Sequence, residues 1–158
     1  MKLSEFKSFV NKFKNNPVPG RHLFIWNGNL NQLLDYIPTD ILFTLDMVDL
    51  VHEIDSTNSD EKLFSAFRKL IANRLTDLAS KVKKQAILVV KNNYFFPRYN
   101  IPVSLFYNYF INDRLSVVFQ IDNYFTDQRL PDFVIFKSDR TLEYFQKLTD
   151  LGDLITED

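Results

Sequence analysis

The sequence predicts an α/β fold, a three-layer sandwich in which a mostly parallel five-stranded sheet lies between two layers of helices. Short runs of apolar, often β-branched residues alternate along the chain with segments whose apolar residues recur every three or four positions. Strands that alternate with helices in this way form parallel sheets with helices on both faces. The 158 residues, 46% of them hydrophobic, have the length and composition of a single globular domain.

The chain is expected to begin with a helix. Its apolar residues share helical spacing: Leu3, Phe6, Val10 and Phe13. We predict that this N-terminal helix lies within residues 1–16 and that residues 17–20, which hold two prolines and a glycine, form a connector. The apolar run Leu23–Trp26 then predicts a first strand that is buried on both faces.

The same alternation continues through the middle of the chain. We predict, in order, a short helix over Leu30–Tyr36, a strand over Ile41–Leu45, a brief helix over Val48–Ile54 and a long amphipathic helix that reaches Val82. Asn58 and Glu61 have the spacing of a capping box, which predicts where the long helix begins.

Five further elements are predicted in the last half of the chain. They are a strand over Ala86–Val90, a helix over Val103–Ile111 that follows Pro102, strands over Leu115–Ile121 and Phe133–Phe136, and a closing helix over Leu142–Leu148. The last strand is the one that could run antiparallel, at an edge of the sheet.

Charge and cysteine content exclude several classes of function. The chain has 19 basic and 20 acidic residues, a net charge of −1, whereas proteins that bind nucleic-acid phosphates usually have a basic excess. The one tight basic cluster, Lys81, Lys83 and Lys84, follows a predicted helix, where cations complement the helix dipole. We therefore expect no direct nucleic-acid partner. Because there are no cysteines, disulfides and thiolate metal sites are excluded.

No segment approaches the 18 or so uninterrupted apolar residues of a membrane-spanning helix, and the first residues hold no apolar run typical of a secretory signal. We therefore expect a cytoplasmic protein without a membrane partner.

A ligand of an open parallel sheet binds outside the carboxyl ends of the strands, where the strand order reverses. The residues predicted at those ends form a polar rim: Asn27, Asn29, Asp46, Asn92 and Asp122. Turns that follow strands are polar in any case, so an ordinary solvated loop is the plain alternative.

The nucleotide-binding sequence features are missing. The turn after the first strand, Trp26–Leu33, has one glycine and no lysine, and the third strand ends in Lys91–Asn93 where a magnesium-binding aspartate is expected. His22 and His52 accompany no serine in an elbow sequence. We therefore expect no catalytic residue, no metal and no cofactor. Residual nucleotide binding at Asn27–Asn31 stays open as an alternative.

An enzymatic alternative depends on carboxylates. Asp46, Asp49 and Glu53 are spaced so that one helical face could present all three to a divalent cation. A metal-dependent nuclease or phosphotransferase would use Asp46, Asp49 and Asp122. The plain alternative is an aspartate cap followed by acids near a helix start, where the helix dipole favours them.

The segment 94–110 is unusually aromatic. Helical spacing accounts for Phe106, Tyr107 and Phe110 but leaves other large side chains on a different side or in a loop. Tyrosine and arginine are enriched at the centres of protein interfaces. We therefore predict a partner-binding surface made of Phe95, Phe96, Arg98, Tyr99, Leu105 and Tyr109. A thick core and the stacking of single-stranded bases stay open as alternatives.

The order of elements from Phe43 to Phe125, with the motif Phe96-Pro97-Arg98, resembles small accessory proteins of bacterial phage-exclusion (BREX) systems. It is similar to their BrxB-type component and, more loosely, to the P-loop-like BrxF type. The resemblance implies a degenerate P-loop-like fold and a non-catalytic antiviral-defence component that docks onto larger enzymes in a multi-component complex. The phosphate loop of the nucleotide-binding relatives is absent, and the resemblance supplies no catalytic residues.

Overall fold

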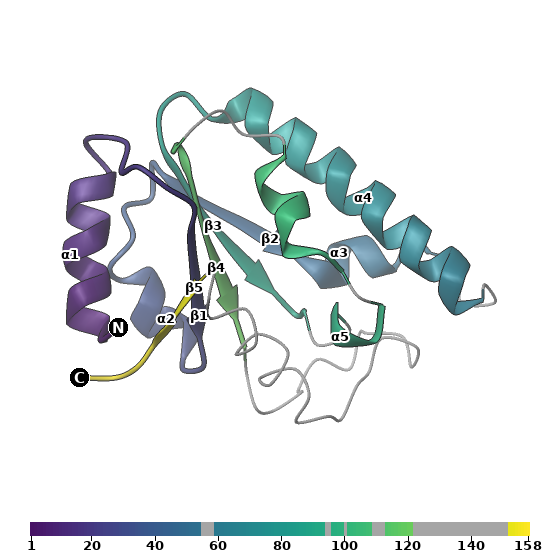
Figure 1. The fold of residues 1–158 in the computed structure, drawn as a ribbon, viewed down its shortest axis with the longest axis horizontal. Helices are drawn as coiled ribbons and strands as arrows, with labels where there is room; N and C mark the ends of the chain where they lie inside the picture. The colour runs from purple at the N-terminus through teal and green to yellow at the C-terminus, as the bar shows by residue number, and fades with distance from the viewer. Residues whose placement is uncertain (55–58, 94–95, 100, 109–112, 122–151) are drawn as a thin grey trace.

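Five parallel strands form one sheet in the spatial order β2-β3-β4-β1-β5 (Figure 1). A computed structural model describes residues 1–54, 59–93, 96–99, 101–108, 113–121 and 152–158. The strands are β1 (His22–Trp26), β2 (Leu42–Asp46), β3 (Ala86–Lys91), β4 (Leu115–Gln120) and β5 (Gly152–Ile155).

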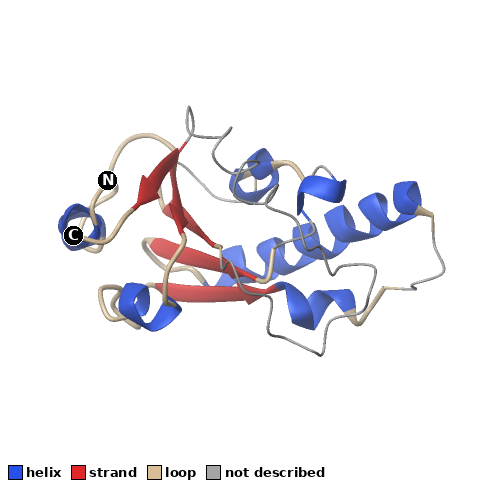
Figure 2. Cartoon of the chain, turned by 90° about the horizontal axis from the view of Figure 1, so that it is seen from below, coloured by secondary structure: helices blue, strands red, loops and turns tan. Residues whose placement is uncertain are grey.

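Helices cover both faces of this sheet (Figures 1 and 2). One face packs against α1 (Leu3–Phe13) and α2 (Leu30–Leu34). The other packs against α3 (Met47–Val51), α4 (Asp60–Lys81), α5 (Phe96–Tyr99) and the 3₁₀ helix η1 (Val103–Tyr107). The predicted α/β architecture is therefore confirmed, and the described strands are all parallel.

The central strands alternate their side chains between two cores. In β1, Leu23 and Ile25 belong to the core beneath α4, whereas Phe24 and Trp26 belong to the core beneath α1. Because both faces are covered, β1, β3 and β4 are almost wholly buried and their sequences are continuous apolar runs. The edge strand β2 is only partly buried, and its central residue Thr44 is exposed.

The first four predicted strands are confirmed, with ends shifted by one residue at most. The prediction for the start of the long helix is wrong, because the N-cap is Ser59, whose Oγ accepts a hydrogen bond from the Lys62 N–H at 3.4 Å. Where a helix was predicted over Val103–Ile111, the described part, Val103–Tyr107, is a 3₁₀ helix. The predicted strand Phe133–Phe136 and helix Leu142–Leu148 lie outside the described residues.

Strand β5 was not predicted. It is four residues long and begins with Gly152, so its sequence carries little of the apolar pattern that marks the other strands. It pairs in parallel with β1, with Ile25 opposite Leu154 and Trp26 opposite Ile155.

Across the part of the chain that the structure describes, no helix is both long enough and apolar enough to cross a membrane.

The outer side of β5 is covered by the first residues of the chain, which lie beside the yellow end of the ribbon in Figure 1. The Leu3 N–H donates to the Thr156 oxygen at 2.8 Å, and the Thr156 N–H donates to the Met1 oxygen at 2.9 Å. The Met1 nitrogen donates to the Leu154 oxygen at 3.1 Å. This edge of the sheet is therefore hydrogen-bonded to the chain's own N-terminal segment.

The same segment leads into α1, whose N-cap residue, Lys2, has no acceptor in its side chain. Asp158 supplies one: its Oδ1 accepts from the Ser4 N–H at 3.1 Å and from the Ser4 Oγ at 2.7 Å. These hydrogen bonds lower the pKa of the Asp158 carboxyl, against a small opposing effect of desolvation and with help from the charge of Lys2. A carboxylate at this helix start also suits the helix dipole.

Candidate functional site

The carboxyl ends of the strands are the first place to look for a site. The chain leaves β1 through α2 for β2 at the far edge and then returns strand by strand, so the strand order reverses next to β1. Asn27 and Asn29 lie in the turn after β1, whereas Asp46 and Asn92 follow β2 and β3. With β4 between β3 and β1, the two groups are separated by roughly 10 Å. The fifth predicted rim residue, Asp122, lies outside the described residues.

The turn after β1 is closed by its own side chains. The Trp26 ring is buried, and its Nε1–H donates to the Asn29 oxygen at 2.9 Å. The Asn29 Oδ1 accepts from the Asn31 N–H at 2.8 Å and so caps α2. The amide that would otherwise face a ligand at the start of α2 is thus already paired.

Gly28 has a packing role in this turn. A Cβ on Gly28 would lie 2.4 Å from the Trp26 ring, so the glycine makes room for the indole. Its φ is outside the left-handed region, whereas phosphate-binding loops aim successive N–H groups at the ligand through left-handed residues. The single glycine noted in the sequence therefore does not form a phosphate cradle.

Two amide side chains, one buried and one half-buried, join the ends of β3, β4 and β1. The Nδ2 of Asn93, which is fully buried, donates to the oxygens of Val90 at 3.1 Å and Gln120 at 3.3 Å. The Gln120 Nε2 donates to the Gly28 oxygen at 3.4 Å. Within the described residues, the Oδ1 of Asn93 has no hydrogen-bond partner. The sequence places Asn93 at the end of the third predicted strand, but Gln120 was not singled out, because an amide at the end of a strand looks like an ordinary turn residue.

Asp46 acts as a helix cap. Its Oδ1 accepts from the Val48 N–H at 3.0 Å and from the Asn92 Nδ2 at 2.7 Å, and its Oδ2 lies 3.7 Å from the Lys91 Nζ. Asn92 reaches it from a left-handed backbone conformation, with φ of 55°. The structure thus brings together two of the predicted rim residues, but as partners of each other.

The three carboxylates proposed for a cation are not gathered. Asp46 has the partners just described, and the Glu53 Oε1 pairs with Arg74 Nη2 at 3.1 Å. Nowhere in the described ranges do three His, Asp or Glu side chains form a group that could hold a metal ion. The plain alternative, an aspartate cap at the start of α3, is confirmed.

Both histidines have ordinary structural positions. The His22 Nε2 lies 3.0 Å from the Val18 oxygen, and its ring packs against Phe9 with 4.9 Å between centroids. His52 is exposed and forms the C-cap of α3.

The aromatic segment corrects a prediction. Phe96, Tyr99 and Leu105 were expected to be exposed for a partner, but the structure buries all three in the core beneath α4. Phe96 packs against Phe119, and Tyr99 against Phe67, with ring centroids 6.2 and 5.1 Å apart. The connection from β3 to β4 has to cover the sheet beside α4, and its large side chains fill that space.

The exposure of the other three predicted partner residues is not tested, since Phe95, Tyr109 and the side chain of Arg98 lie outside what the structure describes.

Tyr107, at the end of η1, donates from its hydroxyl to the His22 oxygen at 2.6 Å. Burial raises the pKa of this phenol, and the guanidinium of Arg21 over its ring opposes the shift. Tyr107 therefore holds η1 on β1.

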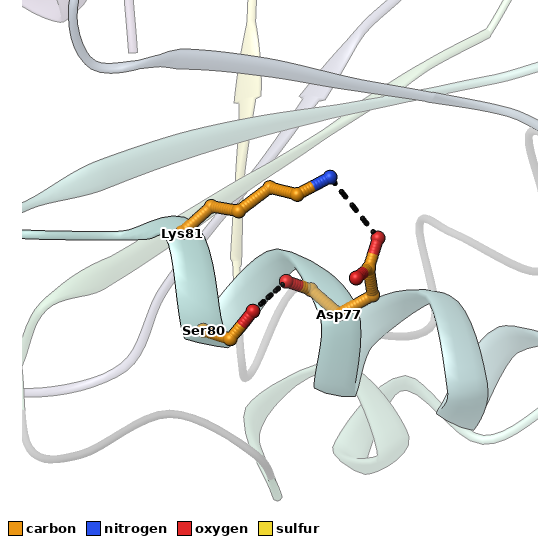
Figure 3. Close-up of polar contacts among 3 residues, drawn as sticks. All are labelled: Asp77, Ser80 and Lys81. Carbon is orange, nitrogen blue, oxygen red and sulfur yellow. Dashed lines mark hydrogen bonds and ion pairs between the residues drawn. The ribbon is translucent and has the colours of Figure 1, made fainter.

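A pocket of about 190 Å³ lies on the α4 face of the sheet, between β2, α3 and α4. Its floor is aliphatic: Leu45, Leu50, Leu75, Leu78 and Leu88. Its rim is charged: Asp46, Asp49, Arg74, Asp77 and Lys81. Figure 3 shows that Lys81 reaches back along α4 to the Asp77 carboxylate, 3.1 Å away. The sequence could not reveal this pocket, because it depends on how α4 lies against an edge strand.

Comparisons with protein-family models, with curated proteins and with solved structures found no match for this chain.

Proposed function

We propose that this chain is a non-catalytic protein-interaction component of a larger bacterial assembly, such as a phage-defence complex of the BREX kind, built on a degenerate P-loop-like fold. It docks onto larger enzymes and brings no nucleotide or metal chemistry of its own.

The observation that carries the proposal is the closed turn after β1. In a P-loop-like protein this turn leads from a central strand into a helix and holds phosphate. Here β1 is central and leads into α2, as such a fold requires, but the Trp26 ring packs over Gly28 and Asn29 caps the helix. A parallel sheet with a strand–turn–helix unit but no phosphate cradle at that turn supports a protein that works through its surfaces.

The polar groups that follow β2 and β3 support the same function. Asp46, the carboxylate after β2, accepts from Asn92 and from the α3 backbone through its Oδ1, and its Oδ2 lies beside the Lys91 ammonium, so its contacts are those of a structural helix cap. The order of elements that resembles phage-exclusion components adds the kind of assembly in which such a protein would work.

The test is co-purification from the bacterium itself. The full chain is tagged at its chromosomal locus, and the proteins that co-purify at fixed stoichiometry are identified and reconstituted from pure components. We expect a complex with a larger enzyme, and we expect phage to plaque more efficiently when the gene is deleted. Thermal-shift assays with ATP, GTP and Mn²⁺ should show no stabilisation of the isolated chain.

Turnover of ATP, or metal-dependent nuclease activity of the purified chain that is lost on Asp46→Asn, would contradict the proposal. A monomer that co-purifies with nothing at fixed stoichiometry would contradict it equally.

A further inference from the structure

Among the described residues, no strand pairs with the outer side of β2, so this edge of the sheet is open as far as the structure describes it. The Ile87 N–H donates to the Ile41 oxygen at 2.8 Å, so the backbone groups of Ile41 face β3. Backbone groups alternate sides along a strand, which places those of Phe43 and Leu45 toward β3 and those of Leu42, Thr44 and Asp46 toward the outside. Thr44, at the centre, is exposed, and β2 ends the sheet as described. The outward N–H and C=O of Thr44 pair with no described residue and are therefore available to a further strand.

The pocket described above begins at this edge. Leu45 of β2 contributes to its aliphatic floor, and α4 forms its far wall. Its volume of about 190 Å³ is below the roughly 300–1,000 Å³ of pockets that enclose whole small-molecule ligands. An apolar side chain from a strand laid along β2 is the kind of group that fits it.

The edge is also acidic. Between His22 and Lys62 the sequence has no lysine or arginine. Asp46 and Glu53 are paired with Lys91 and Arg74, but Asp40, just before β2, and Asp49, at the pocket rim, make no ion pair with any described residue. Both carboxylates are exposed, one near each end of the strand.

We propose that the β2 edge binds an extended segment of a partner protein as an additional strand. The segment places an aliphatic side chain in the pocket between β2 and α4 and carries lysine or arginine near its ends, where Asp40 and Asp49 attract it. In this mode of recognition, main-chain hydrogen bonds supply affinity and the pocket supplies specificity. The inference rests on the interaction function proposed above and names the class of partner segment.

A second copy of this chain fits the edge less well. Pairing β2 with another β2 would bring Asp40, Asp46 and Asp49 of two copies to one interface with no basic residue from the same stretch to balance them. Like charges across paired strands are destabilising. A basic segment of a different protein has the complementary charge.

The test uses a variant that removes only the outward donor. Thr44→Pro deletes the N–H that an added strand would use, and it costs no hydrogen bond to β3, because proline is tolerated where the N–H faces away from the sheet. Thr44→Val is the matched control, because it keeps the N–H and a β-branched side chain. Circular dichroism establishes that each variant is folded.

The probe is a library of random twelve-residue peptides displayed on phage. It is selected on the full chain, with counter-selection on Thr44→Pro, and recovered peptides are synthesised and titrated calorimetrically. We expect alternating aliphatic residues flanked by lysine or arginine, binding that is about tenfold weaker to Thr44→Pro, and unchanged binding to Thr44→Val. Asp49→Lys, an exposed change that leaves the backbone intact, should weaken binding about fivefold, and less so at high salt.

Three results would overturn the inference: identical selected pools on wild type and Thr44→Pro, selected peptides without basic residues, or a wild-type dimer that Thr44→Pro dissociates. Its failure is separable from that of the proposed function. If Thr44→Pro and Asp49→Lys both keep the stoichiometric complex seen on co-purification, the interaction function stands and the β2 edge is not its docking site.

Discussion

The two edges of the sheet differ in whether the outward backbone N–H and C=O groups are hydrogen-bonded to another described segment. At the β5 edge, Met1 and Leu3 form hydrogen bonds with Leu154 and Thr156, and Asp158 caps the helix that follows. At the β2 edge, the outward groups of Thr44 face no described strand, and an aliphatic pocket lies directly beside them. Natural proteins usually protect strand edges because bare ones recruit other chains. One edge is hydrogen-bonded to the N-terminal segment, whereas the other pairs with nothing in the described part of the chain, and this difference suggests a use for the β2 edge.

The largest expected effect comes from breaking the closed edge at its anchor. Phe6 of α1 is fully buried and packs against Phe24 with 5.1 Å between ring centroids. Phe6→Ala should lower the free energy of unfolding by about 3–5 kcal/mol, because it leaves a cavity under the helix that positions Met1–Leu3. Urea unfolding measures this, with the exposed Lys12→Ala as control. A loss below about 1 kcal/mol would mean that α1 is not what holds this edge.

A proline at each edge sharpens the comparison. Thr156→Pro removes the N–H that donates to the Met1 oxygen, whereas Thr44→Pro removes an N–H with no described partner. We expect Thr156→Pro to cost about 1 kcal/mol more than Thr44→Pro, the usual net contribution of one hydrogen bond. Urea midpoints of the two variants, each beside its valine counterpart, give the difference. Equal losses would show that the N-terminal pairing contributes nothing.

The closed edge should also respond to acid. The pKa of Asp158 is lowered from its ordinary 3.8 mainly by its hydrogen bonds with Ser4, so its stabilising contribution is present above pH 3.8 and is lost as the pH falls through the lowered value. Asp158→Asn should remove this part of the acid dependence. Unfolding measured from pH 5 to pH 2 tests it, with Glu157→Gln as the exposed control. Parallel curves for wild type and Asp158→Asn would exclude this role for the carboxylate.

The smallest effect on stability is expected at the open edge. Thr44→Lys places a charge on an exposed position that has no described hydrogen bond, so the free energy of unfolding should change by less than about 0.5 kcal/mol. Lysine on an edge strand discourages pairing with other chains. Light scattering during concentration should therefore begin at a higher protein concentration than for wild type. A strongly destabilised Thr44→Lys protein would show that this edge is covered.

The strands that the sequence predicted correctly are those whose own residue types indicate how deeply they are buried. β1, β3 and β4 are buried on both faces, and their continuous apolar runs predicted this. The sequence of β2, Leu-Phe-Thr-Leu, reads the same way, so its place at an edge could not be predicted. Edge or centre depends on strand order, which is set by contacts between residues far apart in the chain.

In the candidate site, too, features set by neighbouring residues could be predicted, whereas features set by contacts between distant residues could not. The cap at Asp46 was foreseen because capping depends on neighbouring residues. The closure over Gly28 was not foreseen, because it depends on the direction of the Trp26 indole ring. The burial of Phe96 and Tyr99 was missed, because the sequence of an aromatic-rich connection is similar whether the connection covers a sheet or faces solvent. The paired acids and bases of the β2 edge emerge only once α4 is placed beside it.

Trp26 is the only tryptophan in the chain, and it is buried with its Nε1–H bonded to Asn29 at the one turn where a phosphate ligand would enter. Its fluorescence is therefore a built-in, label-free report on that turn. Emission from a dry, hydrogen-bonded indole should be blue-shifted and should keep its wavelength when a partner docks on the distant β2 strand. Any molecule that opened the turn would displace this ring and move its spectrum to the red.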